Sequence, residues 1–107
     1  MLRKTKRRYV SVEIESEARV IAQIFMDALW GAIVKLYGEY GASQTGLKLI
    51  DYNQEANLAI IRISLTALEA ALTAIASITN MGNAPTAVRV TAISGTLKSL
   101  RKGTHKR

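Results

Sequence analysis

Basic residues at the two ends of the chain are the strongest chemical feature of the sequence. Residues 1–8 and 98–107 each contain five lysines or arginines and no aspartate or glutamate. They are Arg3, Lys4, Lys6, Arg7 and Arg8 at one end, and Lys98, Arg101, Lys102, Lys106 and Arg107 at the other. Clustered cations neutralise phosphates and release counterions, so these arms predict nucleic-acid contact. The alternatives are tails that only keep the protein in solution, or a membrane-surface segment, for which the arms lack an apolar face.

No set of residues in the sequence is suited to catalysis or to metal binding. The chain has no cysteine and a single histidine, His105, third from the end. That composition excludes a thiol nucleophile, a cysteine zinc site and a pair of histidines. The carboxylates are scattered, and Glu13, Glu15 and Glu17 alternate along the end of a predicted strand. We therefore expect no catalytic residue, no metal site and no cofactor bound by this chain.

A second candidate site lies on the outer side of the first predicted helix. Polar residues are expected on that side, but Trp30 lies there with Val34, and Met26 is at its margin. An exposed tryptophan with aliphatic neighbours is typical of a protein interface, so Met26, Trp30 and Val34 form a predicted partner surface. The alternative is that the C-terminal helix of the same domain covers Trp30.

Hydrophobic periodicity predicts the elements that position these residues. A period of two indicates strands over 9–15, 47–52, 58–65 and 87–94, and the third of these is apolar enough to be central. A helical period runs over 17–40, with a second helix from Thr66 and a short basic helix over 96–102. The stripe predicted to be buried in the first helix consists of Ile21, Ile24, Phe25, Ala28, Leu29, Ala32, Ile33, Leu36, Tyr37 and Tyr40.

Local signals predict where the two long helices begin and bend. Ser16 is a candidate N-cap for the first helix, and the segment Thr66–Glu69 fits a capping box for the second. The second helix is expected to bury Leu68, Leu72, Ile75 and Ile78 and to end within 80–85, with Gly82 as a left-handed cap. The first helix is longer than the strands it covers, so it overhangs the sheet or bends near Gly31 or Gly38.

The predicted order β-α-β-β-α-β favours a ferredoxin-like α/β sandwich. This class has a four-stranded antiparallel sheet with two helices on one face, to which a short basic C-terminal helix is added here. We expect one domain over 9–97, with a basic arm at 1–8 and another at 98–107. No apolar run reaches the roughly 18–20 residues that span a bilayer, so we expect a cytoplasmic protein without membrane contact.

The face of the sheet away from the helices is a further place where nucleic acid could bind. Tyr9, Ser11 and Glu13 alternate with the buried residues of the first strand, and Lys48, Tyr52, Arg62 and Arg89 are candidates for the same face. RNA-recognition domains stack bases on aromatic residues of their two central strands. Here only Tyr9 is available, so the sequence favours an ordinary polar face, or one covered by the C-terminal segment.

Two separated motifs carry a resemblance to a known family. They are the segment Leu36-Tyr37-Gly38-Glu39-Tyr40-Gly41-Ala42-Ser43, followed by Gly46-Leu47, and the later pair Ala87-Val88-Arg89-Val90 and Ser94-Gly95-Thr96-Leu97-Lys98. With Ala28-Leu29-Trp30, they make the chain resemble the archaeal ribonuclease P protein component 2 family from Arg8 to Arg101. Ser94, Gly95, Thr96 and Lys98 would belong to the family's C-terminal motif.

The resemblance implies a protein subunit of the ribonucleoprotein that removes the 5′ leader of precursor tRNA. In that family the catalyst is ribonuclease P RNA with its Mg²⁺, and the fold is ferredoxin-like. The implied partners are this RNA, precursor tRNA in the complex, and ribonuclease P protein component 3, in a heterodimer or heterotetramer. Two alternatives stay open, a free-standing or ribosomal RNA-binding domain and a small-molecule regulatory domain of the same fold.

Overall fold

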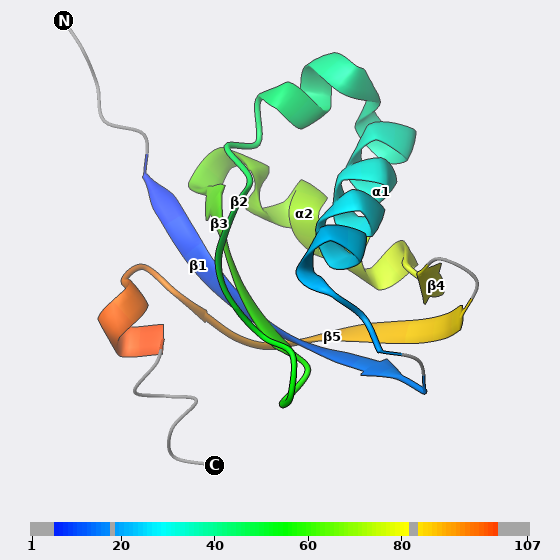
Figure 1. Ribbon diagram of the computed structural model, residues 1–107. Helices are drawn as coiled ribbons and strands as arrows, with labels where there is room; N and C mark the ends of the chain where they lie inside the picture. Colours follow the sequence, from blue (N-terminus) through cyan, green and yellow to red (C-terminus); the bar gives the residue numbers. More distant parts are fainter. Residues whose placement is uncertain (1–5, 18, 82–83, 101–107) are drawn as a thin grey trace, which may run out of the picture.

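The computed structural model describes residues 6–17, 19–81 and 84–100, and the elements alternate between strands and helices (Figure 1). In chain order they are β1 (Arg7–Ser16), α1 (Ala22–Ser43), β2 (Lys48–Asn53), β3 (Leu58–Ser64), the 3₁₀ helix η1 (Leu65–Ala67), α2 (Leu68–Ser77), β4 (Asn80–Met81) and β5 (Ala84–Ser94). A helical turn over 97–100 follows β5. The four strands predicted from the sequence are all present, and β5 begins earlier than expected.

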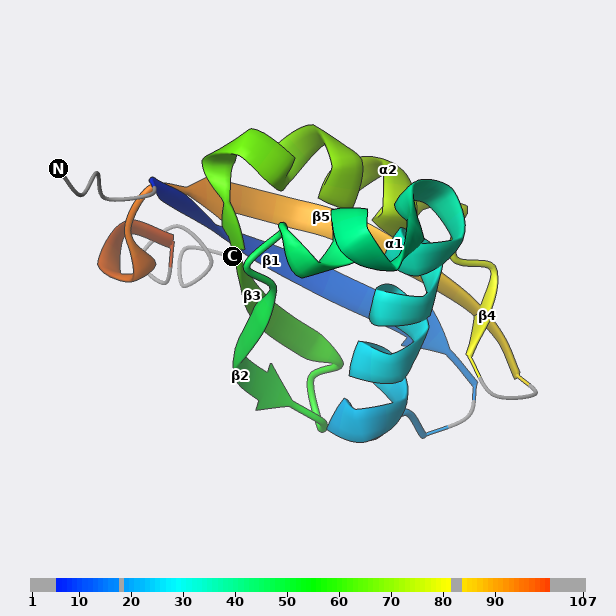
Figure 2. The ribbon, with the colours of Figure 1, turned by 90° about the horizontal axis from the view of Figure 1, so that it is seen from above.

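The strands form one antiparallel sheet in the order β2-β3-β1-β5-β4. Both long helices cover the same face of the sheet, as the two views show together (Figures 1 and 2). The sheet has five strands where four were expected, because Asn80–Met81 pairs with the beginning of β5. The sequence of this segment was interpreted as a helix end, and a two-residue strand is too short to show a period.

The hydrophobic core lies between the sheet and the helices, with β1 at its centre. Alternate residues of β1, Val10, Val12 and Ile14, are buried, as their period of two predicted. Phe25, Leu29 and Ile33 of α1 are buried against them, and α2 adds Ala71, Ala74 and Ile75. The expected α2 stripe is confirmed for Ile75 and Ile78, while Leu68 and Leu72 are half-buried.

Much of the stripe predicted to be buried in α1 is exposed. Five of its large residues remain in contact with solvent, namely Ile21, Ile24, Leu36, Tyr37 and Tyr40. The apolar stripe is wider than the surface that the sheet offers, so its margins lie outside the core. Beyond Gly38, which has φ +79° and ψ 169°, the helix changes direction. The predicted bend is therefore at Gly38, where glycine adopts this left-handed backbone at little cost, and Gly31 stays helical.

Both helices begin later than their local signals predicted. Helix α1 starts at Ala22 instead of Glu17, and no side chain caps it. The preceding segment is held instead by Tyr52, whose hydroxyl donates to the carbonyl oxygen of Val20. The capping box at Thr66 is also wrong, because the chain makes a 3₁₀ turn there and no side-chain cap forms at α2. The predicted cap at Gly82 lies outside the described residues.

Candidate nucleic-acid interface

The structure brings the beginning of β1 and the end of β5 together at one end of the sheet. The two strands pair antiparallel, with Tyr9 opposite Ser94. The Arg8 guanidinium lies beside Gly95, since a Cβ placed on that glycine would be 3.5 Å from Arg8 Nη1. Figure 1 shows the start of β1 and the turn after β5 at the same end of the molecule. Basic residues from the two ends of the sequence, Arg7 and Arg8 on β1 and Lys98 in the turn after β5, therefore lie at the same end of the sheet.

The segment that resembles the family's C-terminal motif builds the turn after β5. The hydroxyl of Ser94 accepts from the Thr96 N–H at 3.3 Å, and Thr96 Oγ1 accepts from the Ser99 N–H at 3.2 Å. The Leu100 N–H donates to the Thr96 carbonyl oxygen at 3.1 Å, and Leu100 itself is only 1% exposed. Thr96 thus caps the turn, the Leu100 side chain is buried, and Lys98 is left exposed.

Four of the ten predicted RNA-binding residues lie within the described residues, and they are close to the meeting point of the two strands. They are Lys6, Arg7, Arg8 and Lys98. Arg7 and Arg8 belong to β1, which begins two residues earlier than the sequence predicted. The Lys6 carbonyl oxygen accepts from the Leu65 N–H at 2.8 Å, which fixes the chain just before the strand. The other six, Arg3, Lys4, Arg101, Lys102, Lys106 and Arg107, lie outside the described residues.

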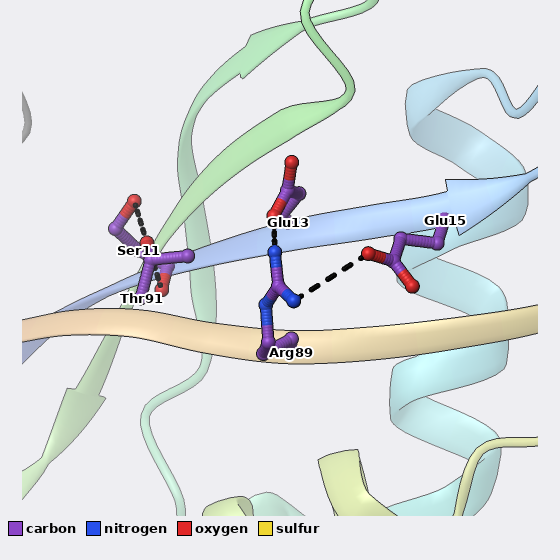
Figure 3. A network of polar contacts seen from close by, with 5 residues as sticks. All are labelled: Ser11, Glu13, Glu15, Arg89 and Thr91. Carbon is purple, nitrogen blue, oxygen red and sulfur yellow. Dashed lines mark hydrogen bonds and ion pairs between the residues drawn. The ribbon is translucent and has the colours of Figure 1, made fainter. Parts of the chain in front are cut away.

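The opposite end of the same two strands carries a network of paired charges (Figure 3). Arg89 forms an ion pair with Glu13 and a second with Glu15 at 3.5 Å. Nearby, the Thr91 hydroxyl lies 3.0 Å from the Ser11 hydroxyl and 3.1 Å from the Ser11 carbonyl oxygen, next to a register shift between β1 and β5. Glu13 and Glu15, interpreted from the sequence as a polar face, therefore neutralise an arginine on the neighbouring strand.

The predicted partner surface on α1 is partly exposed. Trp30 is 41% exposed, whereas Met26 and Val34 are half-buried and pack against the core. The turn after β5 lies on the other side of the sheet from α1 (Figure 1). The described part of the C-terminal segment therefore does not cover Trp30.

An open groove on the other flank of α1 was missed by the sequence analysis. It lies between α1 and the segment that connects α2 to β4, and its apolar lining includes Ile24, Ala28, Leu36, Ile78 and Met81. Ile24 and Leu36 had been assigned to the core, so the pattern alone gave no reason to place them on a surface. Their exposure, together with that of Trp30, makes α1 apolar on both flanks of its buried side.

Within residues 6–17, 19–81 and 84–100, no group of three histidine, cysteine or carboxylate residues is placed to hold a metal ion. In the same part of the chain, no helix is long and apolar enough to cross a membrane. Among the titratable groups, Tyr52 is perturbed: its burial raises its pKa above the ordinary value of 10.0. That tyrosine fixes the segment before α1 and takes no part in the basic surface.

A small antiparallel α/β domain with basic residues gathered at one end of its sheet is typical of nucleic-acid-binding proteins. The chain belongs to the Rpp14/Pop5 family, whose model it matches over residues 8–104. It is 23% identical over 97 residues to ribonuclease P protein component 2 of Pyrococcus furiosus, covering 91% of this chain and 81% of that protein. Its fold is similar to a chain in the cryo-EM structure of yeast ribonuclease MRP, with a TM-score of 0.69 and 16% identity over 99% of this chain and 94% of that one.

Proposed function

We propose that this chain is a protein subunit of ribonuclease P, which assists the catalytic RNA in removing the 5′ leader of precursor tRNA. Family membership over almost the whole chain supports the proposal, and so does the similarity to ribonuclease P protein component 2. In this proposal the catalytic groups and the Mg²⁺ belong to the RNA, and the chain supports the RNA without contributing a catalytic group. Its strand order β2-β3-β1-β5, with both helices on one face, supports a ferredoxin-like class with β4 as an added edge strand.

The structural observation that carries this proposal is the joining of the two basic ends at β1 and β5. Arg7 and Arg8 lie on β1 and Lys98 lies in the turn that follows β5, so described basic residues from both ends of the sequence lie at one end of the sheet. Such a surface attracts the phosphate backbone and makes binding dependent on salt. The same surface also suits a free-standing or ribosomal RNA-binding domain, so the RNA that the chain selects decides between these functions.

The protein partner in this proposal is ribonuclease P protein component 3, in a heterodimer or heterotetramer. We place its binding site at Met26, Trp30 and Val34, where the exposed Trp30 is four residues along the helix from each of two half-buried apolar residues. Tryptophan is the residue type that most often dominates the binding energy of an interface. The assembly would act on precursor tRNA in the cytoplasm.

Reconstitution of precursor-tRNA cleavage tests this function. Ribonuclease P RNA and the remaining protein subunits of the source organism are assembled with and without this chain, and cleavage at the mature 5′ end is measured at limiting Mg²⁺. We expect the chain to increase the rate, and the purified chain with Mg²⁺ but no RNA subunit to cleave nothing. Unchanged cleavage, together with recovery of ribosomal RNA instead of ribonuclease P RNA on the tagged chain, would favour the ribosomal alternative.

A further inference from the structure

A row of four side-chain positions crosses the open face of the sheet, which is the face turned away from α1 and α2. The register places Lys48 of β2 opposite Arg62 of β3, Arg62 opposite Tyr9 of β1, and Tyr9 opposite Ser94 of β5. Tyr9 alternates with the buried residues of β1, so the row lies on the open face. Directly opposed residues in antiparallel strands lie about 4.5–5.5 Å apart, so these four positions are contiguous.

The row is at the same end of the sheet as the joined basic ends. Arg7 lies two positions before Tyr9 on β1 and therefore shares its face. Figure 1 shows the turn over 97–100, which contains Lys98, on the side of the sheet opposite the helices. The row therefore extends the basic surface from the chain ends onto the sheet itself.

The charges on the open face are distributed unevenly. Arg89 is neutralised by Glu13 and Glu15, and these are the two ion pairs within residues 6–17, 19–81 and 84–100. Lys48 and Arg62 thus have no ion pair in that part of the chain, and their end of the face keeps its positive charge.

The nearest carboxylate in the register is Asp51 on β2. It lies opposite Ile60, and its Oδ1 accepts from the Tyr52 N–H at 2.9 Å. A single carboxylate is outnumbered by the cations of Lys48, Arg62 and Arg7, so this end of the face stays positive even when Asp51 is counted with it.

The guanidinium of Arg62 has a donor that is not satisfied. Its Nε is buried and has no hydrogen-bond partner within the described part of the chain. Leaving a buried donor unpaired costs about 1–3 kcal/mol, and more when the group is charged. The cost is recovered when the guanidinium turns outward to an oxygen acceptor above the face. A phosphate suits this role, because its oxygens match the two parallel donors of an arginine.

We propose that Lys48 and Arg62, with Arg7 beside them, bind the phosphates of a single-stranded RNA segment, and that Tyr9 stacks on one of its bases. Proteins that bind single-stranded RNA combine a basic path for the backbone with aromatic side chains for the bases, which is the chemistry of this row. This inference depends on the proposed function in one respect, which is that the ligand is RNA.

The salt dependence of RNA binding tests the row, with Arg89 as an internal control on the same face. Lys48→Gln, Arg62→Gln and Arg89→Gln each remove one charge, but Arg89 alone is already paired with carboxylates. Affinity for a short unstructured uridine RNA and for ribonuclease P RNA is measured by fluorescence anisotropy over a range of salt concentrations. We expect Lys48→Gln and Arg62→Gln each to flatten the salt slope by about 0.7, and the Arg89→Gln slope to match the wild type.

Two further variants separate charge from stacking and from misfolding. Tyr9→Leu removes the aromatic ring without changing charge, so we expect affinity to fall about 5- to 150-fold with an unchanged slope. Arg62→Lys keeps the charge, so its slope should match the wild type; this controls for damage to β3, as does a thermal melt of each variant.

If Lys48→Gln and Arg62→Gln both keep the wild-type salt slope, the proposal that the row binds RNA phosphates is refuted. The proposed function would remain intact, because the reconstituted cleavage measures it independently. If the salt slope flattens equally in all three glutamine variants, RNA is attracted by overall charge, and the proposed binding at the row is refuted as well. Loss of partner-protein binding with normal RNA binding would assign the row to an acidic protein segment instead.

Discussion

Trp30 and Leu29 are adjacent in sequence, but the structure gives them different roles, and this difference can be tested. Leu29 is fully buried, whereas Trp30 is 41% exposed. A tryptophan covers roughly 150–250 Å² when it is fully buried, so roughly 60–100 Å² of Trp30 remains for a partner to cover. At about 25 cal/mol per Å², this area corresponds to about 1.5–2.5 kcal/mol of binding free energy, or about 10- to 70-fold in affinity.

Both substitutions to alanine should destabilise the fold, because the covered part of Trp30 also packs within the domain. Leu29→Ala removes a core side chain and should cost about 2–5 kcal/mol of unfolding free energy. For a domain of this size, that loss lowers the melting temperature by at least about 8 °C. Leu29→Ala is therefore a control that loses stability without changing the outer surface of α1.

The assay compares the two variants well below both melting temperatures. Binding of each to ribonuclease P protein component 3 is measured by calorimetry, and folding is checked by circular dichroism. We expect Trp30→Ala to lose about 10- to 70-fold in affinity, and folded Leu29→Ala to bind like the wild type. Equal affinity of the two variants would refute the assignment of Trp30 to the interface. Failure of the wild-type chain to bind would refute the partner itself.

Three other predictions concern the Tyr52 contact, the C-terminal turn and the arms. Tyr52→Phe removes the hydrogen bond to Val20 and should cost about 0.5–1.5 kcal/mol at neutral pH. Because burial raises the pKa of Tyr52, the folded chain holds the proton of the Tyr52 hydroxyl more tightly than the unfolded chain does. The stabilisation that comes from this difference is present below pH 10.0 and is lost as the pH rises through the pKa of the folded chain. Urea unfolding should therefore show the wild type losing stability relative to Tyr52→Phe above pH 10.0, and a constant difference would contradict this. Thr96→Ala removes the cap of the turn and should speed amide exchange at Ser99 and Leu100, by a local loss of about 0.5–2 kcal/mol, whereas Thr73→Ala in α2 should not change exchange there. Deleting residues 1–5 and 103–107 removes Arg3, Lys4, Lys106 and Arg107, and each phosphate that the arms no longer neutralise should flatten the salt slope of RNA binding by about 0.7–0.9. An unchanged slope would mean that the arms only keep the protein in solution.

The features that depend on local pattern were predictable from the sequence. The alternation of Val10, Val12 and Ile14 identified the strand that lies at the centre of the sheet, and the glycine at position 38 indicated the bend in α1. The starts of the helices were not predictable. Ser16 and Thr66 resemble caps, but the Tyr52 hydroxyl, from a strand far along the chain, holds the segment before α1. A distant contact of this kind leaves no local signal.

The candidate site was predictable in composition but not in arrangement. The ten basic residues stood out in the sequence, and the pairing of β1 with β5 then brings Arg7 and Arg8 to the same end of the sheet as the turn that contains Lys98. The row of Lys48, Arg62 and Tyr9 depends on the register of three strands, which a period of two does not specify. The exposure of Ile24 and Leu36 was missed because the apolar stripe of α1 is wider than the area that the sheet covers.

The central place of β1 also affects how the protein folds. This strand precedes the other described strands in the sequence, yet it pairs with β3 on one side and with β5, the last of them, on the other. Contacts between residues so far apart in sequence are slow to form, so the sheet is completed only after nearly all the chain is available. The joined basic surface does not exist before that step. An RNA that binds this surface selectively would therefore stabilise the finished fold by mass action, whereas a chain that stops before β5 would leave one edge of β1 unpaired and would lack Lys98.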